Sequence, residues 1–358
     1  MKQTKFYNIH KKYGAKLVDF AGFEMPVKYS SIIAEHKAVR NSVGVFDVSH
    51  MGEIIIKGEK ALDFVQHITV NNASKLEIGK VQYSAMCYKN GGIVDDLLVY
   101  KILDDEYMLV VNGANKEKDF EWMNKNNSFE VDIIDQSDDY SLLAVQGPNS
   151  QKVIEKLIGQ EIDLAYYNYF NSKIGNVNVI VSRTGYTGEL GFESYFKSSD
   201  EDAEIIWEEI FEAGKEFDIT PCGLASRDSL RLEKGFCLYG NDIDQTTTTL
   251  EANLSWITKL KKGDFIGREV LVEQKENGVS RKLVPLIFDT KVFPRKDYEV
   301  KVEDKIVGKI TSGTVSPILE KPIALAYIET EFTKVDTIIN VIIRNKEVEA
   351  KVTKLPFV

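Results

Sequence analysis

The sequence predicts an α+β protein that ends in an all-β domain. Helix and strand patterns alternate along most of the chain, but consecutive strands often follow each other through short turns. From about Arg281 onward only short β runs remain, separated by turn residues. The chain has 358 residues, enough for two or three domains with separate cores, and no repeat or low-complexity tract is visible.

The pattern predicts a first compact unit over residues 53–137. It has a βαββ arrangement and closes at the polar segment 135–139. Its last strand ends at Asn112-Gly113-Ala114-Asn115, where a helix through about Asn124 can begin. Strands are predicted over 53–57, 81–87, 93–102 and 107–111, and a helix over about 60–68.

A second unit follows. Gly147 and Pro148 end a short strand and place a proline in the first turn of the next helix. A later helix, over 199–217, has an acidic start that suits the helix dipole. Its apolar residues at helical spacing are expected in the core; they are Ile206, Trp207, Ile210 and Phe211. The other predicted elements are strands over 141–145 and 178–182 and a helix that ends at about Leu157.

The C-terminal part is predicted to be an all-β domain. Its turn residues separate short β runs at the spacing of a sandwich or a barrel. The join to the preceding part lies within 259–280, where Lys, Glu and Gly are frequent. The predicted β runs are 283–288, 299–302, 305–311, 323–327 and 338–352.

Composition argues against several classes of protein, among them nucleic-acid-binding, disulfide-rich and membrane-spanning proteins. The net charge of -10 argues against a nucleic acid as the main partner. Three cysteines without CxxC spacing and four histidines without ligand spacing predict neither a disulfide framework nor a metal site. The N-terminus lacks a signal-peptide core, and no stretch is long enough to span a membrane. We expect a cytoplasmic protein, or a mitochondrial-matrix protein if a transit peptide has been removed.

Asp95 and Asp96 stand side by side in a run, 91–100, that otherwise has the pattern of a buried strand. Because successive strand residues point to opposite faces, one of the two carboxylates must face inward. Without a partner, such a carboxylate costs several kcal/mol or takes up a proton. The pair therefore indicates either a structural ion pair or turn, or a chemical role, and the strand pattern alone leaves both open.

A glycine-rich segment, 183–193, follows a predicted strand. Its three glycines let the backbone approach a ligand closely, but their spacing fits neither a dinucleotide-binding loop nor a Walker loop. Glu193 enters the next strand, over 192–196, as a carboxylate in an apolar run. It suits the donor edge of a pterin or a guanine, because a carboxylate accepts two parallel hydrogen bonds. The alternative is a hairpin turn with a surface glutamate.

The segment 223–235 predicts a helix with a glycine C-cap. Arg227 lies near the positive start of this helix, where it can hold an anionic or carbonyl group or make only a surface pair. Arg231 and Asp228 are expected to make solvent or interhelix pairs. His50 is expected to be structural, because neighbours in sequence rarely form a catalytic triad.

Taken together, these segments resemble the aminomethyltransferase, or T-protein, family of the glycine cleavage system. The matching segments occur in the family's order along nearly the whole chain, which makes the resemblance specific. They are 19–26, 41–52, 91–100, 183–193, 223–243, and 311–314 with 316–317.

The resemblance implies a three-domain ring in which two α+β domains and a C-terminal antiparallel β-barrel surround a central folate cavity. The first α+β domain would bind folate and be discontinuous, because the second is inserted into it. The implied boundaries are 1–52 with 138–258 for the first domain, 53–137 for the second, 259–280 for the connection and 281–358 for the barrel.

The resemblance also implies a reaction. A one-carbon unit passes from the aminomethyl group on the lipoyl arm of the H-protein to tetrahydrofolate. The products are 5,10-methylenetetrahydrofolate, ammonia and the dihydrolipoyl arm. Tetrahydrofolate is thus the implied co-substrate, the chemistry requires no metal or nucleotide, and the family leads us to expect a monomer.

The same resemblance assigns the site residues. Asp96 matches the family's essential aspartate, which would orient and polarise the folate nitrogens and help to move protons as ammonia leaves. Glu193 matches the residue that binds the pterin edge, and Arg227 matches its basic partner. Asp95 is left on the opposite face in a structural pair. Further positions matched to the cavity are Tyr83, Tyr186, Asn112 and Met51, with Tyr169, Trp256 and Tyr239 near it.

Two other functions stay open at this point. One is a folate-dependent demethylase of a methylated amine or sulfonium compound, against which the full-length resemblance and the lack of a fused oxidase domain count. The other is a non-enzymatic folate-binding accessory protein of iron-sulfur cluster assembly. The segment 235–242, around Cys237, follows the transferase pattern rather than the cysteine motif of those proteins.

Overall fold

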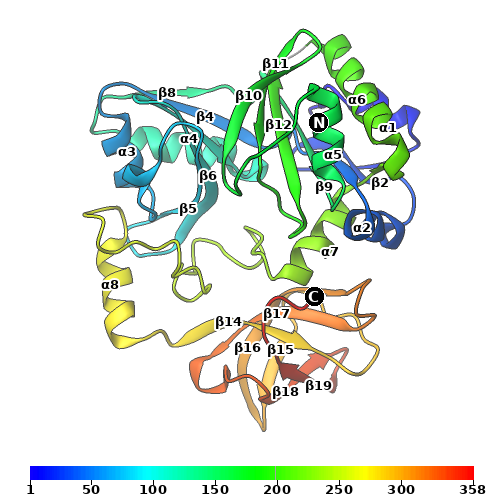
Figure 1. The fold of residues 1–358 in the computed structure, drawn as a ribbon. Helices are drawn as coiled ribbons and strands as arrows, with labels where there is room; N and C mark the ends of the chain where they lie inside the picture. Colours follow the sequence, from blue (N-terminus) through cyan, green and yellow to red (C-terminus); the bar gives the residue numbers. More distant parts are fainter. Residues whose placement is uncertain (198) are drawn as a thin grey trace. The chain divides into compact units, whose positions relative to one another are not determined.

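The computed structural model describes residues 1–197 and 199–358 and confirms the α+β class with a C-terminal antiparallel β-barrel (Figure 1). The chain divides into two compact units, and β5 (Val81–Cys87), β6 (Ile93–Leu103) and α7 (Leu224–Lys234) each contribute residues to both. Unit 1 comprises Met1–Val65, Ala73–Gln82 and Leu97–Asp228, and unit 2 comprises Gln66–Asn72, Tyr83–Asp96 and Ser229–Val358.

Unit 1 contains a six-stranded sheet in the order β10-β11-β12-β9-β3-β13. The pairs are antiparallel except for β13, which pairs parallel with β3. Helices α5 (Ser150–Ile158) and α6 (Asp200–Gly214) bury their apolar faces in one core with these strands. The strands are β3 (Gly44–Asp47), β9 (Tyr140–Gln146), β10 (Tyr169–Ile174), β11 (Val177–Ser182), β12 (Gly191–Lys197) and β13 (Thr220–Pro221).

Helix α6 forms for the reasons that the sequence indicates. Ser199 and Asp202 make a capping box, with each side chain accepting the other's backbone N–H. Trp207 is fully buried and stacks on Phe211 at 4.9 Å between ring centroids, so the predicted core face is confirmed. The helix ends at Gly214 and continues as a 3-10 turn to Phe217.

Helix α5 begins two residues later than predicted. Its N-cap is Asn149, so Pro148 lies before the helix and not in its first turn. The reason is the turn at Gly147, which adopts a φ of 130° and donates its N–H to Leu190 O at 2.7 Å. Only glycine takes up this backbone conformation readily.

The elements predicted over 53–137 form a five-stranded sheet in the order β5-β6-β7-β4-β8. The pattern did not predict β8, an edge strand with aspartates at both ends that is mostly exposed. The N-terminal elements, also not predicted, are α1 (Tyr7–Lys12), β1 (Lys16–Phe20), β2 (Phe23–Lys28) and α2 (Ile32–Asn41). The remaining elements here are β4 (Gly52–Lys57), α3 (Ala61–Ile68), β7 (Glu106–Val111), α4 (Lys116–Lys125) and β8 (Asp132–Asp135).

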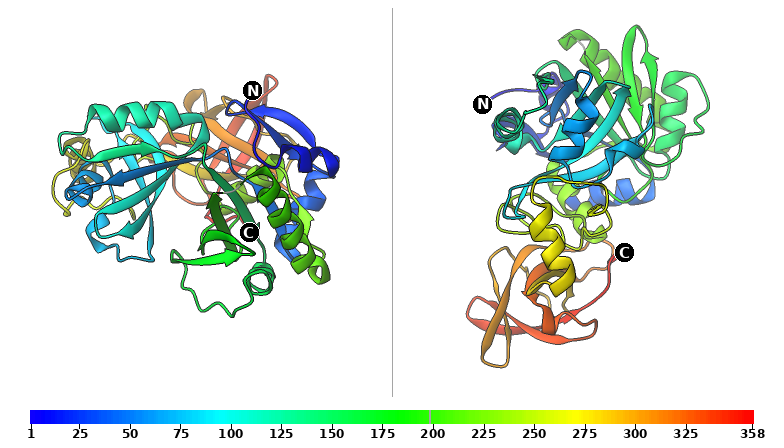
Figure 2. Two further views of the ribbon diagram at one scale, coloured as in Figure 1. Left: turned by 90° about the horizontal axis from the view of Figure 1, so that it is seen from above. Right: turned by 90° about the vertical axis from the view of Figure 1, so that its left-hand side faces the viewer.

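In unit 2 the C-terminal strands close into a six-stranded antiparallel barrel, coloured orange to red in Figure 2. Helix α8 (Arg268–Asn277) precedes the first strand. The single β run predicted over 338–352 is two strands, because Arg344 and Asn345 both adopt positive φ and form a hairpin turn. In barrel order the strands are β14 (Arg281–Ile287), β17 (Pro322–Glu329), β16 (Lys305–Val315), β15 (Glu299–Val302), β18 (Ile338–Ile343) and β19 (Lys346–Val352).

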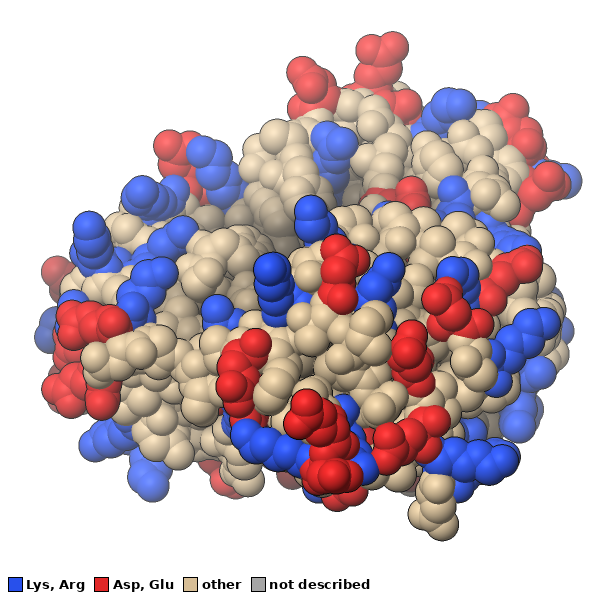
Figure 3. All heavy atoms as spheres, turned by 90° about the horizontal axis from the view of Figure 1, so that it is seen from below, with Lys and Arg blue, Asp and Glu red and all other residues tan. Residues whose placement is uncertain are grey.

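Charged side chains of both signs are interspersed on the face drawn in Figure 3. Within residues 1–197 and 199–358, no helix combines the length and the apolar character needed to cross a bilayer. The same residues contain no group of three or more His, Cys, Asp and Glu side chains placed to hold a metal ion.

Candidate functional site

The two adjacent aspartates lie near the start of β6 and differ in burial. Asp95 is fully buried, whereas Asp96 is partly exposed, as expected for neighbours on opposite faces of a strand. Asp96 Oδ2 accepts a hydrogen bond from the Tyr83 hydroxyl at 2.9 Å. The more accessible carboxylate of the pair is therefore Asp96, and its orientation is fixed by a phenol.

Three aromatic side chains of unit 2 are linked to Asp96 or to the strand that carries it. The ring of Tyr83 lies 5.8 Å from that of Trp256 at an angle of 31°, and Trp256 is 56% exposed. Tyr239 donates from its hydroxyl to Ile93 O on β6 at 3.2 Å. Unit 2 thus brings four of the predicted site residues to one place, where a carboxylate adjoins an accessible aromatic face.

A second cluster belongs to unit 1 and is centred on Glu193 of β12, which is 6% exposed. Glu193 Oε2 accepts hydrogen bonds from Thr184 Oγ1 at 2.5 Å and from the Tyr195 hydroxyl at 3.3 Å. Among the described residues, Glu193 Oε1 accepts none. The surface glutamate considered as an alternative is therefore wrong, and one carboxylate oxygen is available to a ligand.

Arg227 lies in the first turn of α7, whose start is fixed by a buried carboxylate that the sequence did not reveal. Glu35 accepts the Gly223 N–H at 2.9 Å. The Arg227 guanidinium lies 4.8 Å from the ring centroid of Tyr186. Arg227 Nη1 is buried and has no hydrogen-bond partner within the described residues. Burial lowers the pKa of Arg227, and the charge of Glu193 opposes that shift.

His50 is buried, and the structural role that the sequence indicates for it stays a prediction. It is 4% exposed, its ring contacts Phe20 edge-on at 5.2 Å, and Gly113 packs against it. Burial, followed by the positive charge of Arg227, lowers the pKa of His50 to about 4.

Three predicted lining residues lie elsewhere in unit 1. Met51 and Asn112 flank the paired residues Gly52 of β4 and Val111 of β7, so they are neighbours in space. Tyr169 is buried, donates to Lys101 O at 2.6 Å and lies 5.5 Å from the ring of Tyr100. Tyr169 therefore packs against the hydroxyl cluster around Glu193.

The glycine-rich segment is shaped by a side chain of the neighbouring strand. A Cβ at Gly185 or at Gly191 would overlap the Gln146 amide. Gln146 is fully buried, accepts from Thr187 Oγ1 at 2.8 Å and donates to Thr184 O at 3.3 Å. At Gly185 and Gly191, the absence of a side chain lets the backbone pack closely against the Gln146 amide.

Arg231 corrects a prediction. It is 1% exposed, so it does not pair in solvent, and its ion-pair partner Asp242 lies in the loop after α7. Its guanidinium donates to Asp242 Oδ2 at 2.6 Å and to Ser312 Oγ at 2.8 Å, and Thr311 donates to Asp242 Oδ1 at 2.5 Å. The buried ion pair joins α7, the loop after it and the barrel strand β16 within unit 2.

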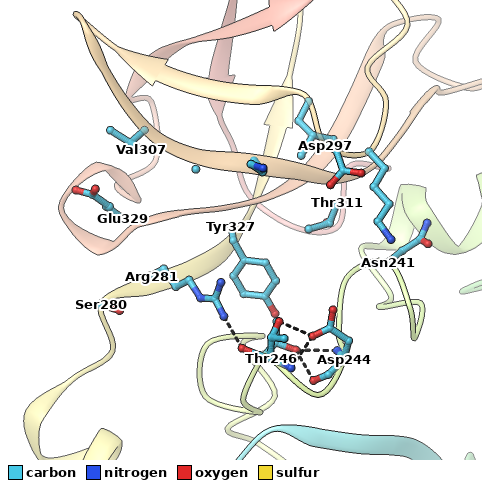
Figure 4. Close-up of a pocket in the computed structure, with 15 residues that line it drawn as sticks. Asn241, Asp244, Thr246, Ser280, Arg281, Asp297, Val307, Thr311, Tyr327 and Glu329 are labelled. Carbon is cyan, nitrogen blue, oxygen red and sulfur yellow. Dashed lines mark hydrogen bonds between the residues drawn. The ribbon is translucent and has the colours of Figure 1, made fainter.

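Unit 2 also contains a cavity of about 640 Å³ that the sequence did not predict (Figure 4). The loop containing Asp244 and Thr246 forms one wall, and Tyr327 and Thr311 of the barrel form another. The Arg281 guanidinium lies 5.0 Å from the Tyr327 ring centroid and donates to Thr246 O at 2.6 Å. None of the predicted site residues lines this cavity.

Comparison with known proteins gives matches along nearly the whole chain. Residues 6–262 match the family model described as the GCVT N-terminal domain, and residues 281–358 match the glycine cleavage T-protein C-terminal barrel domain. An aminomethyltransferase of Flavobacterium psychrophilum is 53% identical over 362 residues, covering 100% of this chain and 99% of the relative. One of Halothermothrix orenii is 46% identical over 359 residues, covering 100% of both chains.

A solved structure is similar over the full length. The crystal structure of the glycine cleavage system aminomethyltransferase T from Bartonella henselae superposes with a TM-score of 0.92 at 33% identity, covering 100% of this chain and 98% of that one.

Proposed function

The chain belongs to the glycine cleavage T-protein family and is a glycine cleavage system aminomethyltransferase, and from this premise we propose the roles of its residues. The donor is the aminomethyl group on the lipoyl arm of the H-protein, and the acceptor is tetrahydrofolate. The products are 5,10-methylenetetrahydrofolate, ammonia and the dihydrolipoyl arm.

Asp96 is the proposed catalytic carboxylate. In the reaction two folate nitrogens bond to the transferred carbon while its bonds to sulfur and to the amino nitrogen break. The two protons lost by the folate nitrogens leave with the sulfur and with ammonia, so the atoms balance. A carboxylate held by Tyr83 at 2.9 Å can orient and polarise the attacking N–H groups and relay these protons.

Glu193 and Arg227 are the proposed pterin-binding pair. The available Glu193 Oε1 suits the donor edge of the pterin, which presents two N–H groups side by side. Arg227 Nη1 needs an acceptor, which the pterin carbonyl supplies. The ring of Tyr186 packs against the guanidinium, with its centroid 4.8 Å from Arg227 Cζ. These complementary donors and acceptors are the observation that carries the assignment to a folate.

The aromatic residues beside Asp96 support the same assignment. Tyr83 and Trp256 offer flat surface to the planar parts of the folate, and Tyr239 holds the strand that carries Asp96. Met51, Asn112 and Tyr169 are assigned to the surroundings of the site. The lipoylated H-protein is the protein partner, and a monomeric state stays a prediction.

The deciding experiment measures ammonia release by the pure protein from aminomethylated H-protein, with and without tetrahydrofolate. Release that requires tetrahydrofolate is expected. Folate binding without release would contradict the transferase reaction and favour an accessory protein. Removal of a methyl group from a methylated amine or sulfonium compound, without ammonia release, would favour a demethylase instead.

A further inference from the structure

Four buried hydroxyl groups form a hydrogen-bonded cluster inside unit 1, and two of them, those of Thr184 and Tyr195, donate to one oxygen of Glu193. The four groups belong to Ser182, Thr184, Tyr195 and Tyr100, and each of these residues is at most 2% exposed. Ser182 is paired with Glu193 across β11 and β12, and Tyr195 is two residues along the same strand, so it points to the same face. The reaction proposed above gives these hydroxyls no role.

The hydroxyl groups of this cluster donate their hydrogens toward Glu193 Oε2. Thr184 Oγ1 lies 2.5 Å from Glu193 Oε2 and 3.0 Å from Ser182 Oγ, but it has a single hydrogen. The carboxylate is the stronger acceptor, so Thr184 donates to Glu193 and accepts from Ser182. Burial raises the pKa of Tyr195, which therefore keeps its proton and donates to the same Oε2 at 3.3 Å.

Tyr100 completes the arrangement from β6. Its hydroxyl lies 3.0 Å from both the Tyr195 hydroxyl and Ser182 Oγ. Burial raises the pKa of Tyr100, and the charge of Glu193 raises it further, so this phenol is also a donor. The cluster therefore sends its hydrogens toward Glu193 Oε2 and none toward Oε1.

The hydrogen bonds to Glu193 Oε2 also bear on how Glu193 interacts with Arg227. Glu193 and Arg227 have opposite charges that influence each other, yet within the described residues they form no ion pair. A glutamate that was free to rotate would pair with the arginine and satisfy both groups. Instead, Glu193 Oε2 is held by Thr184 and Tyr195, and Arg227 Nη1 is buried without a hydrogen-bond partner among the described residues.

We propose that Thr184 and Tyr195, supported by Ser182 and Tyr100, are positioning residues that hold Glu193 away from Arg227 and reserve Oε1 for the pterin donor edge. The inference rests on the proposed role of Glu193 in folate binding. If these residues act in this way, the affinity for folate depends on hydroxyl groups that do not contact the folate themselves.

The test compares Thr184→Val, which keeps the shape and removes the donor, with Thr184→Ser, which keeps the donor. Tetrahydrofolate binding is measured by calorimetry on the full chain under reducing conditions, and turnover is measured with aminomethylated H-protein. Thr184→Val is expected to weaken tetrahydrofolate binding by about tenfold or more, the effect of losing a hydrogen bond to a charged group. Its kcat at saturating folate should change by less than about twofold, since Asp96 is untouched.

Thr184→Ser should bind tetrahydrofolate within about twofold of the wild type, because the donor is restored. Tyr195→Phe removes the longer of the two hydrogen bonds and should give a smaller loss than Thr184→Val. Each variant is checked for an unchanged circular dichroism spectrum and thermal midpoint. Unaltered tetrahydrofolate affinity in folded Thr184→Val would overturn the inference.

A double-mutant cycle with Glu193→Ala, which removes both carboxylate oxygens, separates positioning from a general structural effect. If Thr184 acts only through Glu193, adding Thr184→Val to Glu193→Ala should weaken binding by less than about twofold more. Full additivity of the two losses would contradict the inference. Unchanged folate affinity in Glu193→Ala alone would instead reject the proposed role of Glu193, so the two failures are distinguishable.

Discussion

At the residue scale, several side chains of unit 1 keep buried polar atoms without hydrogen-bond partners among the described residues. They include His50 Nδ1, Arg227 Nη1 and both carboxyl oxygens of Glu53. Each such atom costs about 1–3 kcal/mol unless a ligand, an ion or a water molecule satisfies it. Burial raises the pKa of Glu53 well above its usual value, whereas Arg227 Nη1 has no acceptor among the described residues.

His50 gives a pH-dependent prediction at this scale. Burial lowers its pKa to about 4 in the folded protein, against 6.5 for an ordinary histidine. Between these values the unfolded chain binds a proton that the folded chain does not, so stability falls as the pH drops from about 6.5 to about 4. The full loss from this one group is at most about 3 kcal/mol.

We expect the thermal midpoint of His50→Gln to fall less than that of the wild type between pH 7 and pH 4. The comparison uses differences within each protein, because the substitution also alters packing against Phe20 and Gly113. Equal slopes for the two proteins would show that His50 is not the group responsible.

At the element scale, the loop between β11 and β12 is built around Gln146 of β9. The fully buried amide occupies the space that a side chain at Gly185 or Gly191 would need, and it hydrogen-bonds the loop through Thr184 O and Thr187 Oγ1. The carbonyl that Gln146 holds belongs to Thr184, whose hydroxyl binds Glu193. The packing of this loop is therefore linked to the orientation of the site carboxylate.

Gly191→Ala is expected to lower the free energy of unfolding by about 1–3 kcal/mol, as overpacking does in a tight interior. Adding Gln146→Ala should restore part of the loss, because it removes the amide that the new methyl group overlaps. Chemical denaturation of the two single variants and the double variant measures both effects. Strictly additive losses would indicate that the methyl group meets something other than Gln146.

At the scale of the whole molecule, the parts that follow from local pattern could be predicted from the sequence. The period of α6 and the alternation of the barrel strands specify their elements, and both are confirmed. The turn at Arg344 and Asn345 lacked the usual glycine signal, so two strands were predicted as one run. The start of α5 was predicted too early because it depends on the contact of Gly147 with Leu190.

For the site, too, the sequence predicts local features but not contacts between distant residues. A strand pattern indicates that one of two adjacent carboxylates is buried, but only the folded chain shows that it is Asp95 and that Tyr83 binds Asp96. Arg231 and the hydroxyl cluster escaped prediction because they depend on partners distant in sequence: Ser312 is 81 residues from Arg231, and Ser182 is 82 residues from Tyr100. The assignment of Asp96 and Glu193 to one reaction comes from the family resemblance and stays a proposal.

Asp96 is proposed to carry the chemistry while other residues bind folate, and Asp96→Asn separates these two roles. The amide keeps the size of the side chain and removes its charge, so tetrahydrofolate affinity should stay within about threefold of the wild type. Ammonia release from aminomethylated H-protein should fall by at least about a hundredfold, the contribution typical of a positioned acid or base. Tyr83→Phe, which removes the hydrogen bond to Asp96, should give an intermediate loss. Turnover by folded Asp96→Asn at the wild-type rate would contradict the account.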